Sequence, residues 1–132
     1  MSGLARRENI MEEHTPLVSI IMSVYNEERY LGQSLDSLLG QTLSDFEIII
    51  IDDCSGDGTV ERIEGYHDAR IRLIRNEKNQ GLTKNLNKAL GYCRGKYIAR
   101  MDGDDISLPG RLERQVRYLE THPEIMLTGC QT

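Results

Sequence analysis

The 132-residue chain is predicted to form an α/β domain with a mainly parallel sheet flanked by helices. Apolar runs of strand length alternate along it with segments of helical periodicity, the pattern of right-handed βαβ units. Polar clusters directly follow three of the predicted strands, at residues 25–27, 52–53 and 102–105. Because the carboxyl ends of parallel strands meet at one edge, where ligands bind, we expect these clusters to form a pocket.

The strands are predicted from runs of apolar residues. Residues 17–24 are apolar on both faces, as in a strand covered on both sides, and residues 46–51 are rich in β-branched side chains. Residues 71–74 alternate as a more exposed third strand, and residues 97–101 form a fourth. A last strand is predicted to begin at residues 125–127.

The helices are predicted from apolar residues that recur every three or four positions. Leucines at this spacing indicate a helix over residues 31–39, ending at Gly40, and a short helix is expected over residues 59–66. A third stripe, stopping near Gly91, is formed by Leu82, Leu86, Ala89 and Leu90. Pro109 suits the first turn of a last helix. Its buried face is predicted to contain Leu112, Val116 and Leu119.

Residues 1–15 are polar and charged and are predicted to be a disordered leader before one domain at residues 16–132. The leader has no apolar signal-peptide core, and residues 17–24 are too short to span a bilayer. We therefore expect a cytoplasmic protein, at the inner face of a membrane if a longer parent carries an anchor. The net charge of −5 argues against nucleic acid as a partner. Three widely spaced cysteines are expected to be reduced and structural.

Asp102, Asp104 and Asp105 place three carboxylates within four residues. Two carboxylates roughly 4 Å apart repel by about 4 kcal/mol at an effective dielectric near 20. A divalent cation would remove this cost, and oxygen ligands suit Mg²⁺ or Mn²⁺. The alternative is an acidic turn that caps the following helix.

The other strand ends carry groups suited to a nucleotide. Asp53 could accept hydrogen bonds from a ribose or base, or could be a turn residue. Tyr25 offers a face for base stacking, whereas Asn26 and Glu27 could instead cap the next helix. Lys84 lies early in its helix, where it could pair with a phosphate or remain solvated. No Gly-x-Gly-x-x-Gly or Gly-x-x-x-x-Gly-Lys-Ser/Thr motif is present, which disfavours a dinucleotide site and a phosphate-loop NTPase.

Several ordered motifs together resemble family-2 glycosyltransferases of the GT-A fold, over about residues 16–130. They lie at residues 18–27, 51–59, 79–82, 101–105, 109–115 and 122–125. The resemblance implies a Rossmann-like GT-A fold, a UDP- or dTDP-sugar donor, Mg²⁺ or Mn²⁺, and inversion at the anomeric carbon. By position, Ser23, Tyr25 and Glu27 would line the nucleotide pocket and Asp53 would bind the base or ribose.

The resemblance also concerns the acidic tetrad and the end of the chain. Asp102 and Asp104 match the Asp-x-Asp element, and Asp104 and Asp105 would contact the ribose, diphosphate or metal. The family's catalytic base lies in a later acceptor-side segment, so we expect the chain to be truncated before that half and assign no base. The acceptor would be a saccharide, lipid or other hydroxyl compound in polysaccharide biosynthesis. A truncated sheet would expose apolar surface, which a homodimer could cover.

Two other functions remain open. A nucleotidyltransferase uses a related sheet, metal and nucleotide, but should carry a glycine- and Arg/Lys-rich loop after its first strand, where this chain has residues 25–28. A non-catalytic nucleotide-binding module would share the pocket and lack the acceptor-side base.

Overall fold

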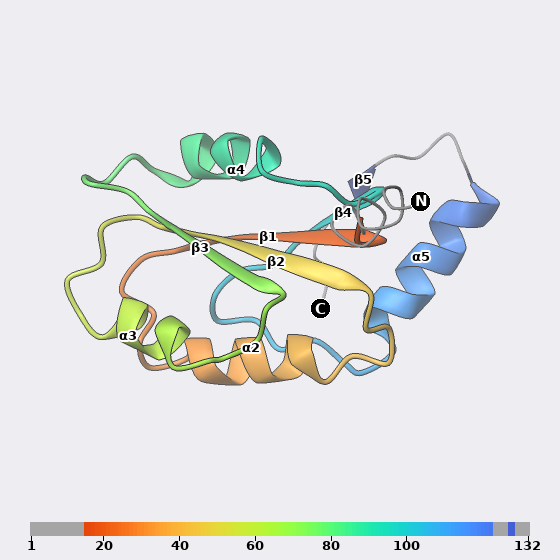
Figure 1. Ribbon diagram of the computed structural model, residues 1–132, viewed down its shortest axis with the longest axis horizontal. Helices are drawn as coiled ribbons and strands as arrows, with labels where there is room; N and C mark the ends of the chain where they lie inside the picture. The colour runs from red at the N-terminus through yellow and green to blue at the C-terminus, as the bar shows by residue number, and fades with distance from the viewer. Residues whose placement is uncertain (1–14, 123–126, 129–132) are drawn as a thin grey trace, which may run out of the picture.

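The computed structural model describes residues 15–122 and 127–128. The predicted leader, apart from Thr15, and the start of the predicted last strand lie outside the described residues. The chain forms a five-stranded, wholly parallel sheet in the order β3-β2-β1-β4-β5 (Figure 1). This order reverses direction at β1, so a crevice is expected beyond the carboxyl ends of the central strands.

The elements follow the predicted alternation closely. The strands are β1 (Val18–Val24), β2 (Phe46–Asp52), β3 (Ile71–Arg75), β4 (Tyr97–Arg100) and β5 (Leu127–Thr128). The helices are α2 (Leu31–Leu39), α3 (Thr59–Glu64), α4 (Leu82–Leu90) and α5 (Arg111–Thr121). The predicted α/β class with a parallel sheet is therefore confirmed.

Helices cover both faces of the sheet. α4 lies on one face, whereas α2 and α3 lie on the other (Figure 1). Alternate residues of β1 and β2, such as Ile20 and Ile48, pack with leucines of α2 and α5, while Ile21 and Ile49 pack with Ala89 of α4. The central strands are apolar on both faces because each face meets a helical layer.

Two helix predictions were wrong in detail. Pro109 precedes α5, which begins at Arg111, and the Gln41 side chain accepts the Leu112 N–H at 3.0 Å in the first turn of this helix. In α4, Leu82 and Leu90 are 48% and 42% exposed and do not belong to the buried face. The buried face carries polar Asn85 beside Ala89. A prediction based on the spacing of apolar residues therefore could not identify this face.

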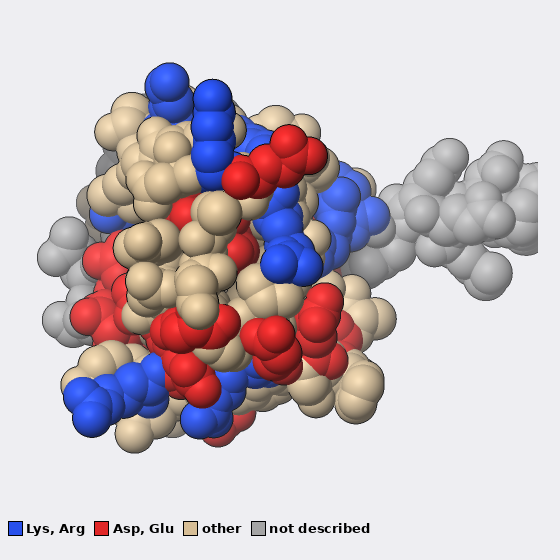
Figure 2. Space-filling model, turned by 90° about the vertical axis from the view of Figure 1, so that its left-hand side faces the viewer, with Lys and Arg blue, Asp and Glu red and all other residues tan. Residues whose placement is uncertain are grey.

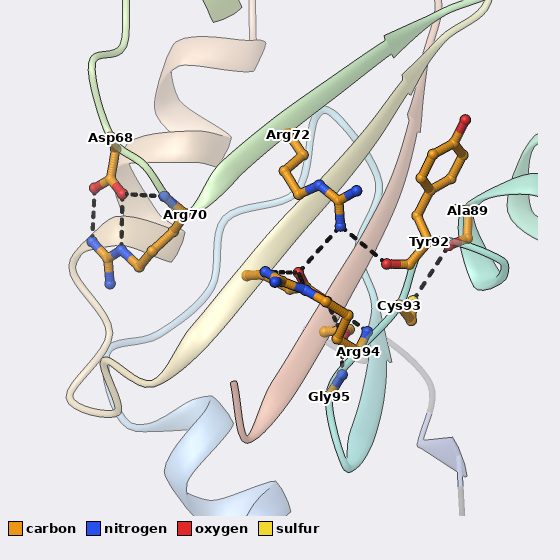
Figure 3. A network of polar contacts seen from close by, with 10 residues as sticks. Asp68, Arg70, Arg72, Ala89, Tyr92, Cys93, Arg94 and Gly95 are labelled. Atoms are coloured by element: carbon orange, nitrogen blue, oxygen red, sulfur yellow. Dashed lines mark hydrogen bonds and ion pairs between the residues drawn. The ribbon is translucent and has the colours of Figure 1, made fainter. Parts of the chain in front are cut away.

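The amino end of the sheet is fixed by a buried carboxylate on β2, Glu47. It accepts hydrogen bonds from Ser19 Oγ at 2.6 Å and from the Arg94 backbone N–H at 2.8 Å. The Arg94 guanidinium lies 3.0 Å away and that of Arg72 3.6 Å away (Figure 3). Burial alone would raise the pKa of Glu47, but the bonds from Ser19 and Arg94 outweigh it and hold the pKa below its ordinary value. This network ties three strands together at the end opposite the predicted pocket.

Candidate functional site

The loops that follow β1, β2, β3 and β4 lie together at the carboxyl edge of the sheet, on the left of Figure 1. Figure 2 looks onto this edge. Carboxylates gather over its middle and lower part, with basic side chains above and below them. The edge is therefore electrostatically divided, as a site for a charged ligand would be.

The loops after β1 and β2 are bonded to each other. The Asn26 N–H donates to Ser55 Oγ at 2.9 Å, and the Gly56 N–H returns a bond to Asn26 Oδ1 at 2.8 Å. The Glu27 N–H donates to Thr59 Oγ1 at 2.8 Å. Glu27 meets the start of α2 through its carbonyl, which accepts the Leu31 N–H at 2.9 Å, and α2 has no side-chain cap bond. These residues also hold two strand ends in one arrangement.

Glu27 and Asp104 line one hollow of about 620 Å³, although 77 positions separate them in the chain. Its remaining lining residues are Asn26, Glu28, Arg29, Tyr30, Asp57 and Arg62. Burial raises the pKa of Glu27, and the negative charges of Asp104, Asp102 and Asp57 raise it further. The carboxylates are therefore close enough to repel one another, and a cation in this hollow would be stabilised.

Residues 102–105, between β4 and α5, form an acidic loop, and of these only Asp104 lines the hollow. Asp102 is exposed and forms an ion pair with Arg100 at 3.3 Å. Asp105 turns back, accepting the Asp102 N–H at 3.4 Å. The alternative that this loop caps the next helix is wrong, because α5 begins at Arg111 and its Leu112 N–H donates to Gln41 Oε1 rather than to the loop.

A divalent cation fits this edge only as an ion shared with a ligand. Among residues 15–122 and 127–128, no three Asp, Glu, His or Cys side chains are grouped to hold a metal. Mg²⁺ commonly uses one or two carboxylates and completes its shell with water and substrate phosphates. The donor set around Asp104 suits that arrangement. Its assignment to Asp104 and Asp105 stays a prediction.

Asp53 is 4% exposed, and its carboxylate accepts hydrogen bonds from groups of the residues that follow β3. Its Oδ1 accepts from Asn76 Nδ2 at 2.9 Å and from the Gln80 N–H at 2.7 Å, and its Oδ2 accepts the Gly81 N–H at 3.0 Å. Burial would raise the pKa of Asp53, but these bonds outweigh it and lower the pKa. The Asn85 side chain also contributes a hydrogen bond that lowers this pKa, so the carboxylate is engaged mainly by its own chain.

The same network reaches Ser23 on β1. Asn76 Nδ2 donates to Asn85 Oδ1 at 2.7 Å, and Asn85 Nδ2 donates to Ser23 Oγ at 3.0 Å. Lys88 Nζ donates to Asn76 Oδ1 at 2.7 Å. The structure therefore joins Ser23 and Asp53, two of the predicted pocket residues, through a pair of asparagines.

Two predicted residues stay at the surface. Lys84 is exposed in the first turn of α4, and the anion at this helix start is the Asp53 carboxylate. Tyr25 is 50% exposed and follows Val24, whose carbonyl accepts the Asp53 N–H at 2.9 Å. Its ring is thus half-exposed at the carboxyl edge of the sheet. Neither residue lines the Glu27–Asp104 hollow.

A second hollow of about 520 Å³ borders the Asp53 network. It is lined by Arg75, Asn76, Glu77, Lys78, Gln80 and Lys88. Sequence reasoning missed Asn76 and Asn85 as supports of Asp53. Asn76 directly follows β3, so the strand-end rule applied to the third strand would have found it.

The profile of "Glycosyl transferase family 2" matches residues 19–131. The chain belongs to glycosyltransferase family 2. Among curated relatives, it is 45% identical over 117 residues to the "Putative glycosyltransferase EpsE" of Bacillus subtilis, covering 86% of this chain and 42% of that protein. It is 41% identical over 103 residues to the Escherichia coli "UDP-Glc:alpha-D-GlcNAc-diphosphoundecaprenol beta-1,3-glucosyltransferase WfgD", covering 78% and 41%. The chain thus spans about two fifths of the length of these family-2 relatives.

Solved structures agree with the family assignment. S. aureus TarS 1-349 in complex with UDP-GlcNAc superposes with a TM-score of 0.76 at 30% identity, over 80% of this chain and 32% of that one. The mannosyltransferase PcManGT from Pyrobaculum calidifontis, in complex with GDP-Man and Mn²⁺, gives 0.71 at 27% identity, over 81% and 33%. The predicted GT-A fold of a family-2 glycosyltransferase N-terminal portion is confirmed. Within the described residues, no helix has the length and apolarity needed to cross a membrane.

Proposed function

We propose that this family-2 chain binds the nucleotide-sugar donor of an inverting glycosyltransferase, with UDP- or dTDP-sugar as donor and Mg²⁺ or Mn²⁺ as cofactor. The observation that carries the proposal is the hollow shared by Glu27 and Asp104 at the carboxyl edge. Its concentrated negative charge, expressed in the raised pKa of Glu27, suits a cation that bridges to a diphosphate.

The nucleoside would lie beside the Asp53 network. Asp53 would meet a base N–H or ribose hydroxyl at the edge of this network, and the half-exposed Tyr25 ring would stack on the base. Such stacking contributes roughly 1–3 kcal/mol per base in single-strand binders. Ser23 would line the same pocket, and Lys84 would approach a phosphate from the start of α4.

The diphosphate would lie toward the acidic loop, where Asp104 would hold the metal, with Asp105 as a further ligand and Asp102 on the ribose side. A bound cation would supply Lewis-acid stabilisation of the leaving diphosphate. An inverting transfer also needs a base for the attacking hydroxyl. We place this base outside the described residues, in the acceptor-side part that the longer relatives include.

The comparisons support the donor class. The names of these relatives and structural neighbours include UDP-Glc, UDP-GlcNAc and GDP-Man, and one includes Mn²⁺. The acceptor would be a saccharide or lipid-linked saccharide of polysaccharide biosynthesis, elongated in the cytoplasm at the inner face of a membrane. Light scattering of the purified chain would test the predicted homodimer.

Calorimetric titration with UDP and UDP-sugars, with and without Mn²⁺, tests the proposal. UDP should bind, and Mn²⁺ should tighten binding by about tenfold or more, a coupling of about 1.4 kcal/mol. Asp104→Asn should remove that gain, whereas Asp68→Asn, a change in the ion pair with Arg70 at the opposite end of the sheet, should keep it. A folded chain that binds none of these nucleotides in either condition would refute the proposal. Binding without sugar transfer by a full-length protein would favour the non-catalytic module.

A further inference from the structure

Arg111, the first residue of α5, carries a buried guanidinium with incomplete hydrogen bonding. The residue is 5% exposed. Its Nη1 donates to Ser107 Oγ at 2.7 Å and contacts Met101 Sδ at 3.6 Å, and its Nη2 reaches the Arg100 carbonyl at 3.5 Å. Its Nε is buried without a partner. In the described part of the chain, no carboxylate forms an ion pair with it.

Such a group is a poor way to stabilise a fold. Burial of a charge costs free energy unless it is paired, and an unsatisfied buried donor adds to that cost. A methionine of similar length would fill the same space without this penalty. The contribution of Arg111 must therefore be sought in what its bonds hold in place.

Its bonds lie on both sides of the acidic loop. Arg100 and Met101 come directly before residues 102–105, and Ser107 follows them after one intervening residue, Ile106. The guanidinium thus connects the entry and the exit of the loop from inside. Other anchors come from α2, where Ser37 Oγ accepts the Ser107 N–H at 3.0 Å and Ser34 Oγ donates to the Asp102 carbonyl at 3.3 Å.

We propose that Arg111 is a positioning residue that holds the acidic loop closed before the donor binds, so that Asp104 faces the hollow beside Glu27. Three carboxylates in four residues tend to spread apart. A buried fork that spans the loop opposes this spreading, and it is anchored beside Leu112, which packs into the core at the start of α5. This inference rests on the proposed function for its effect on metal, but its effect on loop order stands alone.

Three variants of the 132-residue chain separate positioning from folding. Arg111→Met removes charge and donors but keeps length, and Arg111→Lys keeps charge but loses the fork. Arg114→Met makes the same charge change at an exposed position of the same helix and serves as the control. Each is compared with the parent chain by thermal unfolding, by hydrogen exchange without ligand, and by UDP titration with and without Mn²⁺.

In Arg111→Met, amides of residues 101–107 should exchange about tenfold faster or more, a loop-opening change of about 1.4 kcal/mol. Mn²⁺-dependent tightening of UDP binding should fall by a similar factor, whereas metal-free UDP affinity and the melting temperature stay close to those of the parent. Arg111→Lys should restore less than half of the loss, and Arg114→Met should change nothing.

Unchanged exchange in residues 101–107 for both Arg111 variants would overturn the inference. So would a loss of UDP affinity that is equal with and without Mn²⁺ and follows a fall in melting temperature. Were Arg111→Met to fail to fold, the exchange and titration of Arg111→Lys decide the question. If the parent chain binds no nucleotide while Arg111→Met still loosens this loop, the proposed function fails and the positioning role stands.

Discussion

The side chain of Glu27, just beyond β1, lies directly against Gly103 in the acidic loop after β4. A Cβ placed on Gly103 would stand 3.2 Å from Glu27 Cγ and 3.0 Å from Val24 Cγ1. Gly103 is buried, so the loop passes close to the end of β1 at a position where an added side chain would be crowded. This approach brings Asp104 beside Glu27. Burial is the largest cause of the raised pKa of Glu27, and the negative charge of Asp104 is the next.

Gly103→Ala should separate the two strand ends. The new methyl group would make contacts tighter than ordinary van der Waals distances, so the loop or Glu27 must move. Overpacking of this kind costs about 1–3 kcal/mol in the free energy of unfolding. Mn²⁺-dependent UDP binding should weaken as Asp104 leaves the hollow. Urea unfolding and calorimetric titration measure the two effects.

Gly56→Ala provides the matched control, because nothing lies within 4 Å of a Cβ at that position. It should leave both UDP affinity and the free energy of unfolding nearly unchanged. Equal UDP affinities and equal free energies of unfolding for the two variants would show that the contact between Gly103 and Glu27 does not position Asp104 in the hollow.

The strand and helix pattern could be predicted because it depends on local periodicity. Ile48 and Ile49 are both buried, on opposite faces, and the sequence shows this as an uninterrupted apolar run. Leu31, Leu35 and Leu38 are buried at helical spacing. The strand-end rule also predicted that Glu27 and Asp104 would meet, since parallel strands share one carboxyl edge.

The remaining features depend on pairings that no periodicity records. Asp53 takes its hydrogen bonds from Asn76 and Gln80, which lie 23 and 27 positions later. The first turn of α5 donates a hydrogen bond to Gln41, 71 positions before Leu112. Arg111 was part of a recognised motif, but its buried guanidinium could be seen only once the acidic loop was folded around it.

Glu27→Gln should stabilise the metal-free chain at neutral pH. Burial and then the charges of Asp104, Asp102 and Asp57 raise the pKa of Glu27 above 4.5, so the folded state binds its proton more tightly than the unfolded state. The free energy of unfolding therefore falls as pH rises from the unfolded pKa to the folded one, and ionised Glu27 is a net cost above it. Thermal unfolding across pH 4–8 measures this, with the parent and variant converging at the acidic end.

Added Mn²⁺ should make the parent more stable than Glu27→Gln. The cation binds the ionised carboxylates of the folded parent more tightly than it binds the variant, which lacks one of them. Glu64→Gln, an exposed change on α3, is the control and should show neither effect. A Glu27→Gln variant that is less stable than the parent at pH 7 without metal would contradict the repulsion.

Glu47→Gln should destabilise the fold without changing nucleotide affinity. Glu47 receives charge-assisted bonds from Arg94 at the amino end of the sheet, far along β2 from the loops of the site. Loss of such bonds costs about 1.5–3 kcal/mol in the free energy of unfolding. Because the bonds from Ser19 and Arg94 overcome burial and lower the pKa of Glu47, its contribution is present above the unfolded pKa of 4.5 and is lost as pH falls through the folded pKa.

The difference between parent and Glu47→Gln in urea unfolding should therefore shrink below about pH 4.5. Glu113→Gln removes an exposed i,i+4 ion pair with Arg117 and should cost less than about 1 kcal/mol at any pH. Equal losses in the free energy of unfolding for the two variants at pH 7 would show that the buried network around Glu47 stabilises the fold no more than an exposed ion pair does.

Asp53→Asn should abolish nucleotide binding with and without Mn²⁺, in contrast to Asp104→Asn, which should remove only the metal-dependent part. An asparagine amide group would face at least one of the donors now bound by the carboxylate, the Gln80 N–H, the Gly81 N–H or Asn76 Nδ2. One buried donor would lose its partner, at about 1–3 kcal/mol in the free energy of unfolding. The carboxylate offered to the nucleoside would be lost with it, so UDP titrations of the two variants under both conditions measure the two halves of the site separately. Asp53→Asn that keeps its fold and binds metal-free UDP as tightly as the parent would place the nucleoside elsewhere.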